Sequence, residues 1–192
     1  MTLHKSRAIE IHGYALISDD NMIAAADGFT PPTLRNEKDW EYYQNALATS
    51  DLIVFGRRSH EAEPNHRGDR RVVISRTAAG FEERADAYWW NPERFAWLDV
   101  ARELLPDGGH VAAPGGQSVF DLFLGIGYTA FHLSRKRGIS LPHGQTVFSA
   151  CAGGRSAEDV LSAAGLRSAE KIPLDPGQGV EMNVWRAVAA AG

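Results

Sequence analysis

The sequence predicts an α/β fold of three layers, in which helices cover both faces of a mixed, mostly parallel central sheet. Short apolar runs at residues 52–55 and 110–113 are typical of strands that are buried on both faces. Helical segments separate most of the strands, which favours parallel neighbours. The last two strands, at residues 166–174 and 180–188, are joined by a Pro/Gly turn at residues 175–179, which predicts an antiparallel C-terminal hairpin.

The first third of the chain contains a strand, a long loop and a helix. Residues 9–18 alternate apolar and small polar side chains, which predicts a strand that is at least half-buried. The polar segment at residues 19–35 is rich in glycine and proline, and so long a loop in a compact domain is more often functional than accidental. Asn36 is a good N-cap for a helix over residues 37–49.

The remaining elements follow from the same rules of periodicity and helix capping. We expect further strands at residues 71–75, 85–90 and 128–134, a short helix that opens at residues 57–60, a helix that begins at Pro92 and stops at Gly108, and helices at residues 117–124 and 157–164, the last capped by Ser156 and closed by Gly165. No repeat or linker divides the sequence, so residues 1–192 are predicted to form one domain.

Composition excludes several classes of function. The net charge of −4 argues against a nucleic-acid-binding surface, because such proteins usually carry a basic stripe. One cysteine, Cys151, leaves no internal disulfide framework and fits a reducing compartment. No apolar run approaches the 18 or so residues of a membrane span, and the histidines show no metal-ligand spacing. We therefore expect a cytoplasmic protein that binds a small molecule and no metal.

Two strand-to-helix junctions carry residues suited to binding an anion. At the first, Gly56 follows a buried strand and precedes a helix start, where backbone N–H groups favour a phosphate. Arg57 adds a guanidinium that can hold a phosphate through two hydrogen bonds. The alternative is a plain buried strand that ends in a solvated basic turn.

At the second junction, Gly115 and Gly116 precede a helix that starts at Gln117, and adjacent glycines let a ligand approach the backbone closely. The alternative is an ordinary glycine turn. Neither G-x-G-x-x-G nor G-x-x-x-x-G-K-[ST] occurs in the sequence, so a dinucleotide would have to be held by the two junctions together.

Two further positions could carry chemistry. Arg76, with Ser75 and Thr77, follows a strand and could face the extra phosphate that distinguishes NADPH from NADH; a surface arginine at a turn would look the same. Asp39 shares a helix face with aromatic residues such as Tyr43, where burial would raise the pKa of its carboxyl and let it relay a proton. An acid in the first helical turn is also good capping practice, so the sequence leaves both roles open.

In their order and spacing, these segments resemble the dihydrofolate reductase superfamily, and within it the reductase domain of the riboflavin-biosynthesis deaminase–reductase. The resemblance covers nearly the whole chain. It is carried by residues 14–20, 50–57, 72–76, 114–120 and 131–135, and by an L-P-x-G-x-x-x-F element at residues 141–148.

The resemblance implies an NADPH-dependent oxidoreductase, with a homodimer as its expected assembly. It assigns the cofactor to Gly56, Arg57, Ser59, Ser75, Arg76, Gly115, Gly116, Gln117 and Ser118. It assigns the substrate to Asp39 and Ser134, and we expect Tyr43, on the same helix face as Asp39, to join them. The catalytic proton would come from Asp39 or from an ordered water beside it. Residues 23–32, here called the cover loop, would lie over the nicotinamide.

The L-P-x-G-x-x-x-F element favours a 5-amino-6-(5-phosphoribosylamino)uracil reductase. The alternatives are a dihydrofolate or pterin reductase, and a non-catalytic member that binds a dinucleotide. The cover loop lacks the tryptophan usual in dihydrofolate reductases, and the arginine that holds the folate glutamate would fall near Arg70 or Arg71 without a clean match. The H-x-E and P-C-x-x-C motifs of a deaminase are missing, so the expected activity is the reduction alone.

Overall fold

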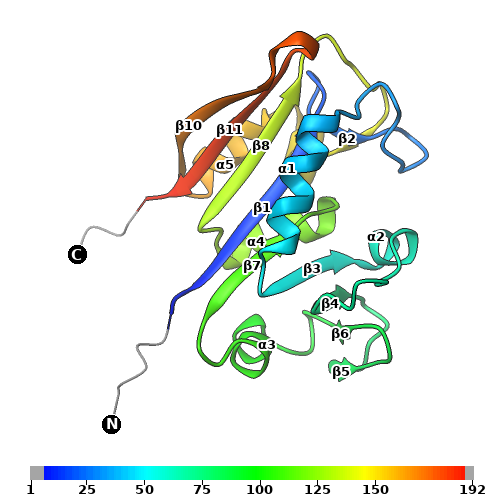
Figure 1. Cartoon of the computed structure of the whole chain (residues 1–192), viewed down its shortest axis with the longest axis vertical. Helices are drawn as coiled ribbons and strands as arrows, with labels where there is room; N and C mark the ends of the chain where they lie inside the picture. Colours follow the sequence, from blue (N-terminus) through cyan, green and yellow to red (C-terminus); the bar gives the residue numbers. More distant parts are fainter. Residues whose placement is uncertain (1–6, 189–192) are drawn as a thin grey trace.

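A nine-stranded sheet runs through the computed structural model, which describes residues 7–188 (Figure 1). The strand order is β10-β11-β8-β1-β7-β3-β4-β6-β5. The strands of this sheet are β1 (Ile9–Ile17), β3 (Leu52–Gly56), β4 (Arg71–Ile74), β5 (Phe81–Glu83), β6 (Tyr88–Trp90), β7 (Gly109–Ala113), β8 (Ala130–Lys136), β10 (Leu166–Asp175) and β11 (Val180–Ala187).

The middle of the sheet is parallel and its edges are antiparallel. β1 lies between β7 and β8 and runs parallel to both, and the parallel pairing continues from β7 through β3 and β4 to β6. β11 runs antiparallel to β8 and β10, which gives the expected C-terminal hairpin, and β5 runs antiparallel to β6. The predicted fold class is confirmed.

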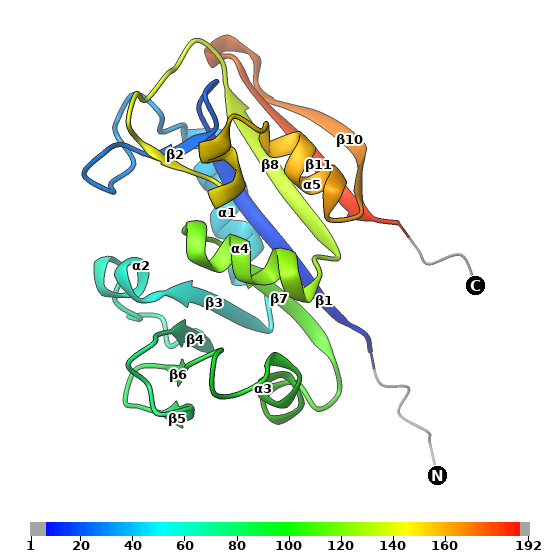
Figure 2. The same cartoon turned by 180° about the vertical axis from the view of Figure 1, so that it is seen from behind.

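Helices cover both faces of the sheet, as the views from the two sides show (Figures 1 and 2). α1 packs on one face, against a cluster that includes Tyr14, Ile53 and Phe55. α3, α4 and α5 contribute to the main core with residues such as Val100 and Phe123. The helices are α1 (Glu37–Ala48), α2 (Arg57–Ala62), α3 (Trp97–Leu104), α4 (Gln117–Ile126) and α5 (Ala157–Ala163), and the short 3-10 helices are η1 (Ser149–Gly153) and η2 (Pro176–Gln178).

Helix capping explains where two of the predicted helices begin. The Asn36 side chain accepts a hydrogen bond from the Asp39 N–H, and α1 follows it. Ser156 accepts one from the Asp159 N–H in the same way at the start of α5. These bonds satisfy N–H groups that have no partner inside the helix, which is why these side chains predict the boundary well.

Two expectations from the sequence are wrong in detail. The helix expected from Pro92 begins only at Trp97, because the Asn91 carbonyl closes a turn with the N–H groups of Arg94 and Phe95. Leu98 in α3 is 54% exposed, although the apolar spacing of this segment would place it on the buried face.

The expected loop at residues 19–35 contains a short strand, β2 (Met22–Ala24), which pairs with β9 (Gln145–Thr146). The partner lies far away in the sequence, so no local pattern could have shown this pairing. β5 was not expected either. Among the described residues, no helix is long and apolar enough to cross a membrane.

Candidate functional site

The two predicted anion-binding junctions lie side by side at the carboxyl ends of the parallel strands. β3 and β7 are parallel neighbours, so the turns that carry Gly56 and Gly115 leave the sheet at the same edge. A Cβ atom built on Gly56 would lie 3.5 Å from Val119 Cγ2 and 4.0 Å from Ser118 Oγ. The first turns of α2 and α4 therefore adjoin.

Both of these helices begin without a capping side chain. The N-cap residue is Gly56 in α2 and Gly116 in α4, whereas Asn36 and Ser156 cap α1 and α5. The first N–H groups of a helix have no partner inside it and lie at the positive end of the helix dipole. An anion placed where α2 and α4 adjoin would meet the amides of both helices.

The backbone at the second junction has a conformation that favours glycine. Gly115 has φ of +111°, and a Cβ atom there would lie 2.8 Å from Phe120 Cζ. Its peptide bond to Gly116 is cis. A Cβ atom on Gly116 would lie 3.9 Å from Ile23 Cδ1, which places the cover loop beside this turn.

The side chains at the two junctions differ in how they are used. Gln117 Nε2 donates to the Thr146 carbonyl at 3.0 Å and to Thr146 Oγ1 at 2.7 Å, so this side chain ties α4 to β9. Of the N–H donors of Gln117, the one on the backbone remains for a ligand. Arg57 Nε lies 3.7 Å from Glu61 Oε1, and both side chains are more than half exposed, so this pair holds Arg57 only weakly. Ser118 is exposed.

The residues expected to meet an adenosine phosphate lie near the end of β4, the strand next to β3. Ser75 is buried, and its hydroxyl shares a hydrogen bond of 2.8 Å with Thr77 Oγ1. Arg76 is exposed. Of these residues, Arg76 is the one that presents a charge to solvent. Ser59 lies half-buried in the first turn of α2.

The cover loop contacts both junctions. Ile23 lies beside Gly116, and Arg58 Nη1 in α2 would lie 3.8 Å from a Cβ atom on Gly28. Phe29, near the tip of the loop, is 68% exposed. The loop therefore spans the adjoining ends of α2 and α4.

The predicted substrate residues lie along α1 and on β8. Asp39 is half-buried, and burial raises the pKa of its carboxyl, while a hydrogen bond from Ser134 acts in the opposite direction. Tyr43 lies one turn further along α1, and burial raises the pKa of its hydroxyl. Trp40 stacks on Tyr43 with ring centres 5.3 Å apart but stays 53% exposed. The structure thus brings Asp39 and Ser134 together and adds Trp40 as an exposed aromatic neighbour.

The two arginines before β4 are both engaged in the fold. Arg70 Nη1 donates to the Leu104 carbonyl at 2.6 Å. Arg71 is buried, donates from Nη1 to the Glu63 carbonyl at 2.6 Å, and lies over the Phe55 ring. Both guanidinium groups are therefore already hydrogen-bonded within the fold, and neither is placed to bind a substrate carboxylate.

A group of histidine and tyrosine side chains on the sheet face beneath α1 was missed by the sequence analysis. This histidine–tyrosine cluster consists of His12, Tyr14, Tyr42, His110 and His132. A signal for it did exist, because His12 and Tyr14 alternate along β1 and must share one face. The register that places Tyr14 opposite His132 could not be known from the sequence.

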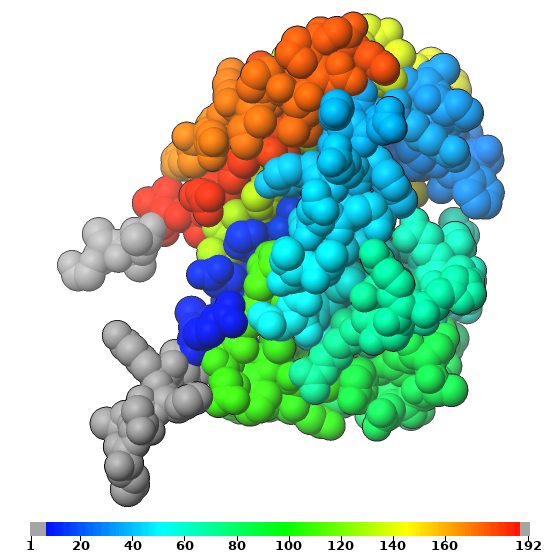
Figure 3. All heavy atoms as spheres, in the orientation of Figure 1, coloured from blue at the N-terminus to red at the C-terminus, as the bar shows by residue number. Residues whose placement is uncertain are grey.

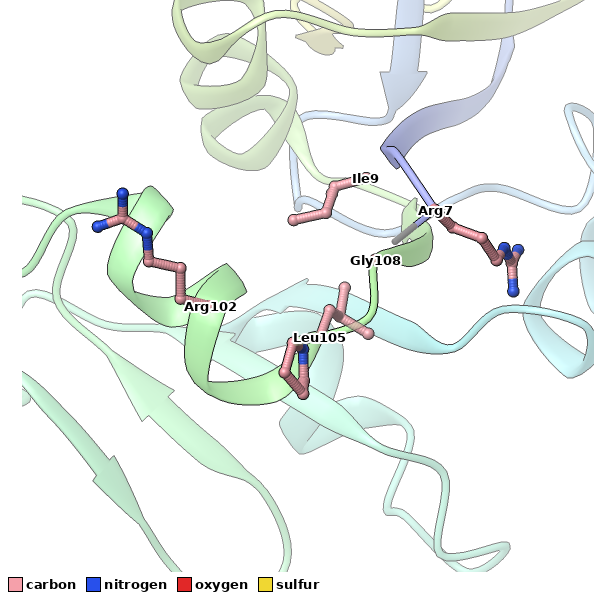
Figure 4. Close-up of a pocket in the computed structure, with 6 residues that line it drawn as sticks. Arg7, Ile9, Arg102, Leu105 and Gly108 are labelled. Atoms are coloured by element: carbon pink, nitrogen blue, oxygen red, sulfur yellow. The ribbon is translucent and has the colours of Figure 1, made fainter. Parts of the chain in front are cut away.

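A pocket of about 400 Å³, here called the amino-edge pocket, lies at the opposite end of the sheet, where the parallel strands begin (Figure 4). It is lined by Arg7, Ile9, Arg102, Leu105, Pro106 and Gly108, from the starts of β1 and β7 and the end of α3. None of the predicted site residues lines it.

Comparison with known proteins gives a likeness in structure only. No protein-family model matches the sequence, and no curated protein matches it. The structure is similar to a dihydrofolate reductase from Enterococcus faecalis, complexed with NADP(H) and RAB-propyl, with a TM-score of 0.65 and 11% identity over 92% of this chain and 95% of that one.

It is similar, too, to a diaminohydroxyphosphoribosylaminopyrimidine deaminase/5-amino-6-(5-phosphoribosylamino)uracil reductase from Thermotoga maritima. Here the TM-score is 0.64 and the identity 14%, over 94% of this chain and 57% of that one. This chain therefore spans little more than half of the bifunctional protein. The likeness confirms the expectation drawn from the sequence motifs: the chain has the dihydrofolate-reductase type of fold.

Proposed function

We propose that this protein is an NADPH-dependent reductase that transfers a hydride to a small heterocycle of the 5-amino-6-(5-phosphoribosylamino)uracil type. The observation that carries the proposal is the meeting of two uncapped helix N-termini, at Gly56 and Gly116, on one edge of the sheet. A dinucleotide needs several phosphate contacts close together, and these amides would supply them.

The residues present fit such a cofactor. The backbone of Gly115 and Gly116 carries no side chain that would block close approach, and the N–H groups of Gln117 and Ser118 open α4. Gly56, Arg57 and Ser59 would hold phosphate from the other helix. When bound, NADPH would supply the hydride.

Recognition of the adenosine 2′-phosphate is assigned to Arg76, with Ser75 beside it. Arg76 extends its charge into solvent past the end of β4, and a guanidinium pairs well with phosphate. The dihydrofolate reductase of similar structure is described as complexed with NADP(H), which supports the choice of cofactor.

The remaining roles fall to Asp39 and the cover loop. Asp39 would hold the proton that the reduced substrate needs, because its raised pKa favours the protonated form at higher pH than for a solvated carboxyl. Ser134 would orient that carboxyl, and Tyr43 would pack against the substrate. The cover loop, already in contact with both junctions, would exclude water from the reacting atoms.

For the substrate, the engagement of Arg70 and Arg71 argues against a folate glutamate tail. The name of the Thermotoga maritima protein supports the ribosylaminopyrimidine. Turnover of this compound or of dihydrofolate, followed through NADPH absorbance, decides between them. If NADPH binds but neither compound is reduced, and NADPH binds equally well to Asp39→Asn, the non-catalytic dinucleotide binder is favoured instead.

The cofactor is tested by thermal unfolding with NADPH and with NADH. A ligand at 100 times its Kd adds about 2.7 kcal/mol to the stability of the folded protein. We expect stabilisation by NADPH, little by NADH at the same concentration, and loss of the difference in Arg76→Ser. Arg102→Ser, an exposed arginine of the amino-edge pocket, is the matched control and should behave like the wild type. Equal shifts with both cofactors in every variant would overturn the Arg76 assignment.

A further inference from the structure

The histidine–tyrosine cluster contains a continuous hydrogen-bonded row of three side chains. Tyr42 Oη lies 2.9 Å from His132 Nδ1, and His132 Nε2 lies 3.3 Å from His12 Nδ1. The row crosses from α1 to β8 and then to β1, so the fold assembles it from three separate elements.

The inner end of this row, Tyr42, lies towards Asp39. Tyr42 follows Asp39 by three residues in α1, a spacing at which side chains are neighbours on the helix surface. Ser134, the partner of Asp39, follows His132 by two residues in β8 and so lies on the same face of the sheet. Burial raises the pKa of the Tyr42 hydroxyl; the negative charges of Glu170 and Asp39 raise it further, and Arg186 acts in the opposite direction.

The outer end of the row faces solvent. His12 is half-buried, and atoms of β1 and β8 are visible between α1 and β11 in Figure 3. Burial, His110 and the nearby Arg186 lower the pKa of His12 to about 4. Burial, together with the neighbouring His12, Arg186 and His110, lowers the pKa of His132 to about 3. Both rings are therefore neutral at pH 7, and each offers one donor and one acceptor nitrogen.

We propose that Tyr42, His132 and His12 form a proton path between solvent and the Asp39 carboxyl, an inference that rests on the reductase function proposed above. A neutral row with one donor and one acceptor at each ring can pass a proton without separating charge over a long distance. A half-buried carboxyl that lies under bound substrate and gives up its proton in each turnover needs such a resupply.

The transfer balances as follows. His12 takes a proton from solvent at Nε2 and passes the proton on its Nδ1 to His132 Nε2. His132 passes the proton on its Nδ1 to Tyr42 Oη, and Tyr42 gives its original hydroxyl proton to the Asp39 carboxylate, directly or through one water. Both rings and the phenol end neutral, and the carboxyl is protonated.

The second branch of the cluster supplies a matched control. Tyr14 Oη lies 3.3 Å from His110 Nε2, and His110 Nδ1 lies 3.3 Å from Ser50 Oγ. Tyr14 stacks on His132 but its hydroxyl bonds to the other branch. Tyr14→Phe and Tyr42→Phe therefore each remove one imidazole-bonded hydroxyl from the same cluster, and only Tyr42 belongs to the proposed path.

The experiment measures how fast Asp39 exchanges its proton with solvent, from the line broadening of its carboxyl ¹³C resonance across its titration. It uses the full chain without substrate, so it does not depend on finding turnover. We expect exchange to slow at least tenfold in Tyr42→Phe and in His12→Asn, and to stay at the wild-type rate in Tyr14→Phe.

Equal rates in Tyr42→Phe, His12→Asn and wild type would overturn the path, as would equal slowing in Tyr14→Phe, which would indicate a structural effect. Thermal unfolding identifies any variant that fails to fold. Binding of NADPH, measured in parallel, reports separately on the proposed function. If NADPH does not bind, the reductase proposal is wrong, and the exchange rates still show whether the proton path exists.

Discussion

Two pairs of helices in this protein begin in opposite ways. α1 and α5 start beneath Asn36 and Ser156, which cover their first amides, whereas α2 and α4 start at Gly56 and Gly116, which cannot. The capped helices lie apart from each other. The uncapped ones adjoin at the carboxyl ends of β3 and β7.

An uncapped start alone does not make a site. α3 also begins without a side-chain cap, at Ala96. What distinguishes α2 and α4 is that their first turns meet, beneath a loop that touches both. Capping side chains cover the first amides of α1 and α5, whereas Gly56 and Gly116 leave those of α2 and α4 uncovered; under the proposed function these amides would meet the phosphates of the cofactor.

The largest expected effect comes from placing a side chain in the uncapped pair. Gly115→Ala should lower the free energy of unfolding by roughly 2–4 kcal/mol, from the positive φ and the contact with Phe120. It should also abolish NADPH binding. Urea denaturation and calorimetry measure the two effects.

Gly125→Ala is the control for that change. Gly125 lies in α4 with open space around its Cβ position, so alanine there should stabilise the helix by roughly 0.5–1 kcal/mol. Similar stabilities for the two variants would show that the Gly115 turn is not constrained as described.

The burial of His132 beneath α1 can be tested through the pH dependence of stability. The folded pKa of His132 is about 3, below the 6.5 of an exposed histidine, so the unfolded chain binds the extra proton as pH falls. Stability is therefore full above pH 6.5 and is lost as pH falls below it, by roughly 2 kcal/mol between pH 7 and pH 5 for this residue. Urea denaturation at several pH values should show a shallower slope in His132→Asn than in the wild type; identical slopes would contradict the buried neutral imidazole.

The smallest expected effect concerns a capped helix. Ser156→Ala removes the hydroxyl that accepts from the Asp159 N–H and should cost about 1 kcal/mol. Ser156→Thr keeps the hydroxyl that accepts from the Asp159 N–H and donates to Asp159 Oδ2, and should cost little. NADPH affinity should be unchanged in both, because α5 takes no part in the proposed site; a change in affinity would blur the distinction between the two pairs of helices.

Much of the fold could be predicted because its signals are local. The Asn36 and Ser156 caps, the apolar runs of β3 and β7, and the Pro-Gly turn before β11 each act over a few residues. The β2–β9 pairing depends on contacts made after folding, and local patterns did not show it. The late start of α3 at Trp97 follows from a local turn at Asn91, which the apolar periodicity did not show.

The candidate site divides in the same way. Gly56 and Gly115 could be singled out by their place after apolar runs, but only the sheet order shows that their turns adjoin. The use of the Gln117 side chain on Thr146 was hidden, since the partner comes from a distant strand. The histidine–tyrosine cluster was hidden for the same reason, because β1, β7, β8 and α1 each contribute to it.

An NMR titration of the ¹⁵N-labelled protein with NADPH tests most directly whether the two helix starts form one site. We predict that the amide resonances of Arg57 and Ser59 in α2 shift together with those of Gly116 and Ser118 in α4, with a single dissociation constant, while the resonance of Leu105 in the amino-edge pocket stays unchanged. Shifts confined to that pocket, or to only one of the two helix starts, would contradict it.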